Sequence, residues 1–546
     1  MSSTSWDTIV IGSGAGGLVA AVALARAGQR VLVLEQHYLP GGWTHSFTLE
    51  GHRFSPGVHY IGELQPGGGI RRMYEGLGLG ADLTFLELNP DGLDHFLIAD
   101  ERFDQPRGRD RWIERLVARF PAEREGIARY FDVLTRIAGD LARADGLLEF
   151  PGVLLLPLRA PTLLRHGFST LGSLLDSCVK DPLLKGLLAA QCGNHGLPPS
   201  RASLPMHAGM TAHYWNGGYY PRGGAKRIPQ ACIRALRRYG GELRLRSRVT
   251  RILVEDHRAA GVRLENGETI LADSVLSNAD PAVTFGRLLP AELTGRERRK
   301  LRRSEYSVGL LSLFCATDLD LRALGYDSGN YWWYRHADVE GIYSRVAGSL
   351  PGDTVDGLFL TITTLKDPGH DARGRHVLEM FTFVPWAPFA RWRDRPSGAR
   401  GGDYDAFKER LADKLLLAAE HVIPDLHRHL TFRSIGTPIT NDHYCESFQG
   451  AAYGTAKTPW QLGPFSFPIR TRIDGLFQCG ASTISHGVGG ASMSGLLAAK
   501  EILGLRTALD CLGPADGSLR VMPSESAAPA PDLPEAADAG EAGFAL

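Results

Sequence analysis

Three glycines near the start of the chain constrain its fold more than any other feature. Gly12, Gly14 and Gly17 follow a strand-like run at residues 7–11, and a helical stretch, a second apolar run and Glu35 come after them. The glycines permit a tight turn, a close approach to a pyrophosphate and close packing of a helix on the sheet. The N-terminus of the helix attracts phosphate, and the carboxylate of Glu35 can accept hydrogen bonds from the ribose hydroxyls. The pattern predicts a dinucleotide-binding strand–helix–strand unit that disfavours a ribose 2′-phosphate.

The composition is that of a soluble globular protein. With 546 residues the chain can form two or three domains. Hydrophobic residues make up 43% and charged residues 22%. Lys+Arg and Asp+Glu both number 60, so the chain lacks the net positive charge that would indicate a nucleic-acid partner. The seven cysteines form no Cys-x-x-Cys pair, which predicts neither a metal site nor a disulfide framework.

The placement of apolar residues indicates a cytoplasmic protein. The first strand begins within six residues of Met1, which leaves no room for a signal peptide. The sequence contains no uninterrupted run of the ~18 apolar residues that a membrane-spanning helix needs. The leucine-rich segment 147–164 is broken by Pro151, Pro157 and Pro161, so it is not one straight helix. It forms either an apolar lid or a peripheral contact with a membrane surface, and both interpretations stay open.

Strand, turn and glycine patterns recur in three blocks, which predicts one domain interrupted by insertions. Asn266-Gly267 is a strong hairpin signal in the second block. We expect an α/β fold with a Rossmann-like, three-layer and mainly parallel nucleotide-binding domain. The expected parts are this discontinuous domain at 1–69, 217–290 and 465–510, a helical insertion at 70–216 that is a lid or faces a membrane, a substrate domain with an antiparallel sheet at 291–464, and a disordered tail at 513–546 rich in Ala, Pro, Glu and Asp.

Further motifs carry a resemblance to a known family. Residues 40–47 read Pro-Gly-Gly-Trp-Thr-His-Ser-Phe, residues 54–62 read Phe-Ser-Pro-Gly-Val-His-Tyr-Ile-Gly, and glycine-rich runs occupy 475–480 and 487–491. With the N-terminal fingerprint, they closely resemble the phytoene desaturase-like FAD oxidoreductases. The resemblance is nearest to the branch of retinol saturase (all-trans-retinol 13,14-reductase) and carotenoid isomerase, and the Gly-Val-His-Tyr-Ile-Gly segment points to it.

The resemblance implies that the cofactor is FAD and assigns residues to it. Trp43 departs from the small or sulfur-bearing residue expected beside the flavin. The implied FAD-binding residues are Gly12, Ser13, Gly14, Ala15, Gly16 and Gly17 at the pyrophosphate, Glu35 and Gln36 at the adenosine ribose, Gly41, Gly42 and His45 along the ribityl chain and flavin, Val249 at the adenine, and Gly480, Gly489, Gly490, Ala491, Ser492 and Met493 at the second phosphate and flavin edge.

Three side chains are candidates for the proton transfer that must accompany flavin chemistry. A flavin transfers hydride or single electrons, and saturating an alkene also needs a general acid. His59 is the first candidate, because it ends a hairpin expected beside the flavin and an imidazole titrates near neutral pH. Tyr60 is a weaker donor, and His486 lies in the C-terminal glycine-rich loop. A purely structural role is the alternative for each histidine.

We predict an enzyme that saturates or desaturates a C–C bond in a long apolar isoprenoid or polyene. The alternatives are a redox-neutral cis–trans carotenoid isomerase, an amine oxidase-like enzyme and a non-enzymatic prenyl-lipid-binding protein. No second intact dinucleotide fingerprint is present, so the electron donor or acceptor stays open among NAD(P)H, a quinone, oxygen and a redox protein. The aromatic run 331–334 either packs in the core or lines an apolar tunnel for the substrate.

Overall fold

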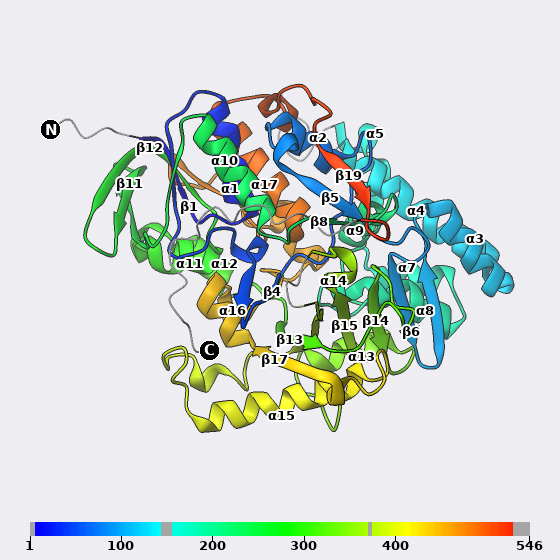
Figure 1. Ribbon diagram of the computed structural model, residues 1–546. Coiled ribbons are helices and arrows are strands. Elements are labelled where there is room, and N and C mark those ends of the chain that lie inside the picture. The colour runs from blue at the N-terminus through cyan, green and yellow to red at the C-terminus, as the bar shows by residue number, and fades with distance from the viewer. Residues whose placement is uncertain (1–5, 144–154, 370–373, 528–546) are drawn as a thin grey trace.

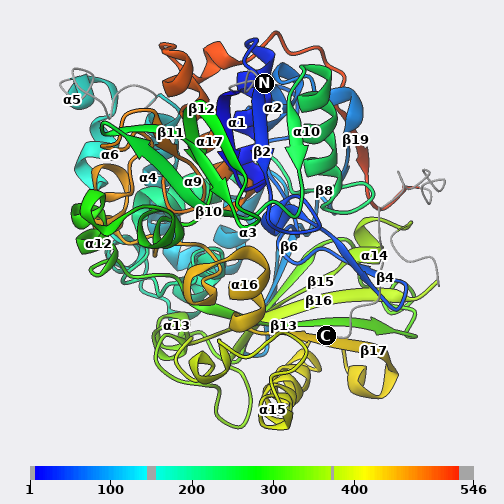
Figure 2. The same cartoon turned by 90° about the vertical axis from the view of Figure 1, so that its left-hand side faces the viewer.

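Two large sheets organise the molecule. The computed structural model describes residues 6–143, 155–369 and 374–527 (Figure 1). Each large sheet has seven strands, and smaller sheets of three and two strands accompany them. Helices cover both large sheets (Figures 1 and 2). The expected α/β fold is confirmed.

The first sheet is built from strands of all three sequence blocks. Its order is β10-β11-β12-β1-β2-β9, with β18 beside β12. The parallel neighbours of this sheet are β1 (Trp6–Ile11), β2 (Val31–Leu34), β9 (Glu242–Arg244), β12 (Thr269–Ser277) and β18 (Leu476–Gln478). Strands β10 (Val249–Glu255) and β11 (Arg258–Leu264) add an antiparallel extension through the predicted Asn-Gly turn. The parallel core places the turn after β1 in the middle of the sheet.

Three helices pack near this sheet, and two of them cross backbone to backbone. They are α1 (Ala15–Arg26), α10 (Arg227–Arg238) and α17 (Gly487–Leu503), which lie side by side in Figure 2. A Cβ atom on Gly495 of α17 would lie 2.0 Å from the carbonyl oxygen of Gly16 in α1. Because neither position has a side chain, the start of α1 packs directly against the middle of α17.

The second large sheet is almost wholly antiparallel, in the order β17-β13-β16-β15-β14-β6-β7. Only β14 and β6 pair in parallel. Its strands are β6 (Asp94–Ile98), β7 (Glu101–Gln105), β13 (Gly309–Thr317), β14 (Asn330–Tyr334), β15 (Gly357–Ile362), β16 (His376–Val384) and β17 (Leu430–Gly436). One face packs on α15 (Gly402–Ala419), and the opposite face turns toward the helical part of the chain.

Strands β6 and β7 lie within residues 70–216, which we expected to be mostly helical. Short buried strands cannot be separated from helical segments by their periodicity. Most of the remaining segment is helical. The helices of this part are α2 (Gly69–Gly76), α3 (Arg109–Arg119), α4 (Arg124–Ala142), α5 (Leu156–Arg159), α6 (Pro161–His166), α7 (Leu171–Cys178), α8 (Pro182–Ala189) and α9 (Leu204–Tyr214).

The leucine-rich segment is described from residue 155 onward. Pro157 and Pro161 each stand in the first turn of a short helix, α5 and α6, where a missing N–H is tolerated. The carboxylate of Asp140 accepts hydrogen bonds from the backbone N–H groups of Thr162 and Leu163, at 2.8 and 2.9 Å, and so caps α6. Within the described residues, every helix is too short or too polar to cross a membrane.

The expectation of a disordered tail from residue 513 is wrong for its first part. Residues 520–523 form β19 (Arg520–Pro523), which pairs in parallel with β5 (Thr84–Glu87). Strand β8 (Tyr219–Pro221) pairs on the other edge of β5. Backbone hydrogen bonds to a free strand edge order this segment, although its composition gives no such signal. Residues 528–546 lie outside the described part of the chain.

Candidate active site

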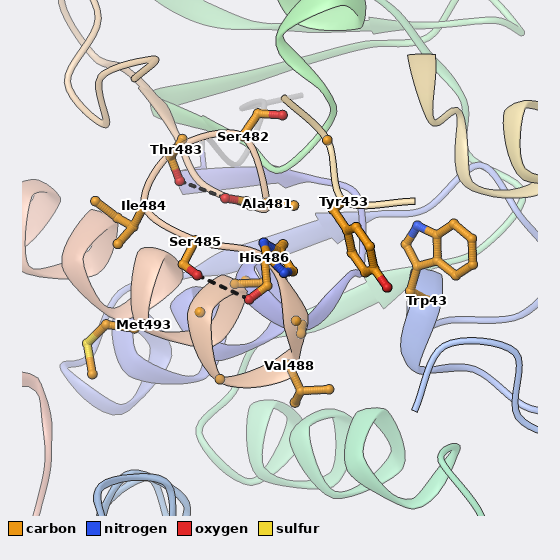
Figure 3. A pocket seen from close by; sticks show the side chains of 18 of the residues that line it. Trp43, Tyr453, Ala481, Ser482, Thr483, Ile484, Ser485, His486, Val488 and Met493 are labelled. Carbon is orange, nitrogen blue, oxygen red and sulfur yellow. Dashed lines mark hydrogen bonds between the residues drawn. The ribbon is translucent and has the colours of Figure 1, made fainter. Parts of the chain in front are cut away.

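A single cavity of about 1060 Å³ runs from the turn after β1 to the helical part of the chain. Residues of both large sheets line it, among them Ile11 and Leu34 of the first and Phe359 and Phe381 of the second. Figure 3 shows the part around residues 481–493, where the ring of Tyr453 lies beside His486. The cavity therefore joins the nucleotide-binding fingerprint to the face of the second sheet.

The glycines of the fingerprint leave room for backbone atoms and one asparagine. Gly12 has a φ of +91°, which disfavours other residues, and a Cβ on Gly17 would lie 2.3 Å from the oxygen of Gly12. A Cβ on Gly14 would lie 2.7 Å from Nδ2 of Asn278. Asn278 follows β12 and also lines the cavity. Sequence reasoning missed Asn278, although the carboxyl end of a parallel strand beside β1 is where ligands bind.

Glu35 directly follows β2 and lines the cavity, and most acceptor positions of its carboxylate are already occupied. It is 8% exposed. Ser13 donates to Oε2 from its backbone N–H at 2.9 Å and from its hydroxyl at 2.6 Å, and His37 N–H donates to Oε1 at 2.9 Å. An ionised carboxylate has about four acceptor positions. One position is left for a ribose hydroxyl, so Glu35 fits the adenosine end of FAD.

Two helices aim their positive ends at the cavity. Ala15 at the start of α1 and Gly487 at the start of α17 both line it. Helix N-termini carry unpaired N–H groups and about half a positive charge, which suits phosphate. Two such ends that line one cavity suit an anionic ligand such as a dinucleotide.

Most residues assigned to FAD from the sequence lie together. Those that line the cavity are Gly12, Gly14, Ala15, Gly16, Glu35, Gln36, Gly41, Gly42, Val249, Gly480, Gly489, Gly490, Ala491 and Met493. Ser13, Gly17, His45 and Ser492 are not part of the lining. Ser13 holds Glu35 instead, and burial lowers the pKa of His45 to about 4, while its Nδ1 contacts the carbonyl of Gly42 at 2.5 Å. These two side chains support the turn rather than reach the cavity.

His59 lies at the junction between the cofactor end and the second sheet. It lines the cavity and its side chain is 15% exposed. Its Nδ1 is 3.3 Å from Oε2 of Glu379 on β16. The rings of Phe359 and Phe381 lie 5.0 and 5.8 Å from the imidazole. His59 thus combines a carboxylate partner, aromatic walls and access to the cavity.

Tyr60 keeps its proton and directs it away from the cavity. Its hydroxyl donates to Oδ2 of Asp94 at 3.2 Å, and its ring stacks on Tyr214 at 4.2 Å. Burial, together with the carboxylate of Asp94, raises the pKa of Tyr60 well above its ordinary value. Tyr60 is therefore a poorer proton source than its place in the sequence indicates.

His486 is held as a neutral imidazole. Burial, with Lys457 and His195 nearby, lowers its pKa well below the ordinary value. Its Nε2 contacts the carbonyl oxygen of Asn194, so this nitrogen carries the proton and donates it. Nδ1 is buried without a hydrogen-bond partner among the described residues. A neutral ring with its single N–H occupied is unsuited to protonate a substrate.

Beyond these residues the cavity is apolar and ends near the surface. Glu379 and Lys366, which sequence reasoning missed, lie buried behind its wall, and no local motif marks either one. The apolar lining of this half includes Leu141, Leu163, Leu164, Phe168, Met206, Met210, Tyr214, Trp332, Phe359, Phe381, Leu462 and Phe465.

Sequence comparisons agree with this geometry. The family model described as "Flavin containing amine oxidoreductase" matches residues 15–318. The chain is 30% identical over 534 residues to the all-trans-retinol 13,14-reductase of Rattus norvegicus. The alignment covers 91% of this chain and 85% of the relative. It is 29% identical over 517 residues to prolycopene isomerase 1 of an Oncidium hybrid cultivar, with 91% and 84% covered.

Solved structures share the fold. An oxidoreductase from Methanosarcina mazei superimposes with a TM-score of 0.63 at 17% identity, over 90% of this chain and 99% of that one. Putrescine oxidase bound to putrescine superimposes with a TM-score of 0.60 at 15% identity, over 92% and 99%. With the fingerprint, the paired helix ends and the family match together, this chain belongs to the flavin-containing amine oxidoreductases and its cofactor is FAD.

Proposed function

We propose that this flavoenzyme saturates or desaturates a C–C bond in a long apolar polyene of the retinoid or carotenoid kind. The observation that carries the proposal is the continuity between the FAD-binding end and the apolar half of one cavity. Its 1060 Å³ lies just above the ~300–1,000 Å³ typical of pockets for one small ligand. The similarity to all-trans-retinol 13,14-reductases supports this substrate class.

Proton transfer in this reaction falls to His59. Bound FAD supplies the hydride acceptor or donor. Of the three candidate groups, Tyr60 donates to Asp94 and His486 donates to a backbone carbonyl. All three line the cavity, but His59 pairs with a carboxylate through Nδ1 alone, which leaves its second ring nitrogen for the substrate. We assign the general acid–base role to its imidazole.

A redox-neutral isomerase is the second candidate, because the prolycopene isomerase similarity covers as much of this chain as the reductase similarity does. An anaerobic experiment separates the two. The FAD-loaded protein is reduced with dithionite and mixed with all-trans-retinol or a carotene. A saturase reoxidises its flavin and yields a product heavier by two hydrogens. An isomerase yields a product of unchanged mass with the flavin still reduced. If no polyene is converted, the proposed function is wrong.

We also propose that the apolar end of the cavity opens onto an anionic membrane surface. Phe168, Trp460 and Phe465 form an exposed aromatic triad, with exposed fractions of 56%, 68% and 40%. Their rings lie 4.8 to 6.0 Å apart, and Phe168 and Phe465 also line the cavity. Exposed aromatic rings beside a cavity mouth favour contact with acyl chains.

Cations lie beside the aromatic triad. Arg296, Arg299 and Arg303, on and just after α12 (Gly295–Leu301), line the same surface hollow as the triad. Each Arg near an anionic surface contributes about 1 kcal/mol of attraction. A polyene could then pass from the lipid into the cavity without crossing water.

The membrane proposal predicts vesicle binding that depends on the triad. We expect the wild type to co-sediment with phosphatidylglycerol-containing vesicles, and the Phe168→Ser/Trp460→Ser double variant to bind at least about tenfold more weakly, because two ring burials are lost. Leu324→Ser, which removes an apolar side chain that is 60% exposed away from the hollow, serves as the control. Equal binding of the double variant, or no binding of the wild type, would rule the surface out.

A further inference from the structure

A row of polar residues crosses the cavity face of the second sheet. Asp94, Asn330, Thr361 and Glu379 lie directly side by side on β6, β14, β15 and β16. The next row on the same face is aromatic, with Trp332, Phe359 and Phe381 in register. Residues two apart on a strand share a face. The polar row therefore lies on the same side of the sheet as the aromatic wall of the cavity.

These polar residues are buried, and most of their atoms are satisfied by one another. Oδ1 of Asp94 accepts from Nδ2 of Asn330 at 3.0 Å and from Nε1 of Trp332 at 3.1 Å. Lys366, at the end of α14 (Thr363–Lys366), donates to Oδ1 of Asn330 at 2.5 Å and to the backbone oxygen of His59 at 2.7 Å. A buried polar network is stable only when its members are paired. The network holds the backbone of His59 in place.

Glu379 has one oxygen committed and one directed at His59. Oε1 accepts the backbone N–H of Ser55 at 2.5 Å. Among the described residues, Oε2 has no hydrogen-bond partner and lies 3.3 Å from Nδ1 of His59, which likewise has none. Glu379 is only 2% exposed. A buried nitrogen that can donate a hydrogen bond and a buried carboxylate oxygen that can accept one, each otherwise unpaired among the described residues, thus face one another at the edge of the cavity.

We infer that Glu379 is a positioning residue that keeps a proton on Nδ1 of His59 and so leaves Nε2 to exchange a proton with the substrate. This inference rests on the proposed function. In the saturation direction the C=C π bond would break and two C–H bonds would form, with bound FAD supplying the hydride and Nε2 of His59 the proton. The substrate would gain its two electrons from that hydride, and the imidazolium would become a neutral imidazole whose remaining proton stays on Nδ1. Water returns the proton to Nε2.

The variant that tests this role is Glu379→Gln. The amide oxygen can still accept from Ser55, while the amide NH₂ replaces Oε2 and donates toward Nδ1 of His59. The neutral imidazole must then carry its proton on Nε2. We expect kcat to fall about 100-fold with KM unchanged, because substrate binding is intact while proton transfer is not. We also expect a larger solvent deuterium isotope effect on flavin reoxidation.

A spectroscopic measurement tests the tautomer independently of activity. In ¹⁵N-histidine spectra above neutral pH, we expect the His59 signals, identified by their loss in His59→Gln, to report Nδ1–H in the wild type and Nε2–H in Glu379→Gln. Glu75→Gln, which removes another buried carboxylate paired with Arg71 outside the cavity, is the matched control. It should change neither the His59 signals nor the kcat.

The outcomes separate this inference from the proposed function. If wild-type protein converts no polyene, the proposed function fails, and the spectra still decide whether Glu379 fixes the tautomer. If the wild type converts a polyene and Glu379→Gln matches it in kcat and isotope effect, the positioning role is wrong. An Nε2–H signal for His59 in the wild type would also overturn it, even if the variant does not fold.

Discussion

Replacing His59 with glutamine is expected to slow reoxidation of the reduced flavin by a polyene about 10²- to 10⁴-fold, the usual contribution of a positioned general acid. The loss should appear in kcat, because glutamine fills a similar space beside Phe359 and Phe381 but has no proton to release at working pH. Stopped-flow absorbance of the flavin under anaerobic conditions measures the rate directly. The FAD absorbance spectrum before mixing should match that of the wild type.

Comparison variants make the assignment to His59 specific. Tyr60→Phe and His486→Gln should each cost less than about tenfold, because both side chains give their proton to a protein acceptor rather than to the cavity. His257→Gln, in the turn between β10 and β11, should have no effect. A larger loss in His486→Gln than in His59→Gln would move the proton role to the glycine-rich loop.

Replacing Gly495 with alanine is expected to abolish FAD retention and to lower the stability of the fold. In an isolated helix this change would stabilise by about 1 kcal/mol. Here the new Cβ would lie 2.0 Å from the carbonyl oxygen of Gly16, so α17 must move away from α1. Forced overpacking costs about 1–3 kcal/mol. The helix ends that line the cavity would then shift relative to one another, and we expect FAD affinity to fall at least about 100-fold.

The glycine prediction is checked by the flavin content of the purified protein and by its thermal unfolding midpoint with and without added FAD. Gly402→Ala is the matched control, since a Cβ there meets nothing within 4 Å at the start of α15. It should keep its flavin and its unfolding midpoint. Full flavin content in Gly495→Ala would show that the close helix crossing is dispensable.

The cofactor end could be predicted from the sequence because its determinants are local. A turn that needs Gly12, a helix N-terminus and an acid at the end of the next strand lie within residues 7–35. The hairpin at Asn266-Gly267 is equally local and was predicted with its turn. Such patterns combine only neighbouring residues, so the chain order alone reveals them.

The substrate end could not be predicted, because strand register brings it together. Glu379 and Asp94 come to lie behind the cavity wall through the pairing of four strands, which no local pattern encodes. The aromatic run 331–334 illustrates the same limit. Trp332 lines the cavity, while Tyr331 and Trp333 pack in the core on the side of α15. Tyr334 is buried and is not part of the cavity lining, so most of the run is core.

The close crossing of α1 and α17 also sets the order in which the protein can mature. Helix α1 emerges from the ribosome early, whereas its partner at residues 487–503 is made near the end of synthesis. Until α17 is made, the apolar face of α1 stays exposed and one of the two helix N-termini that line the cavity is absent. We therefore expect FAD to bind only after synthesis is complete, and nascent chains that end before α17 to need chaperones to avoid aggregation.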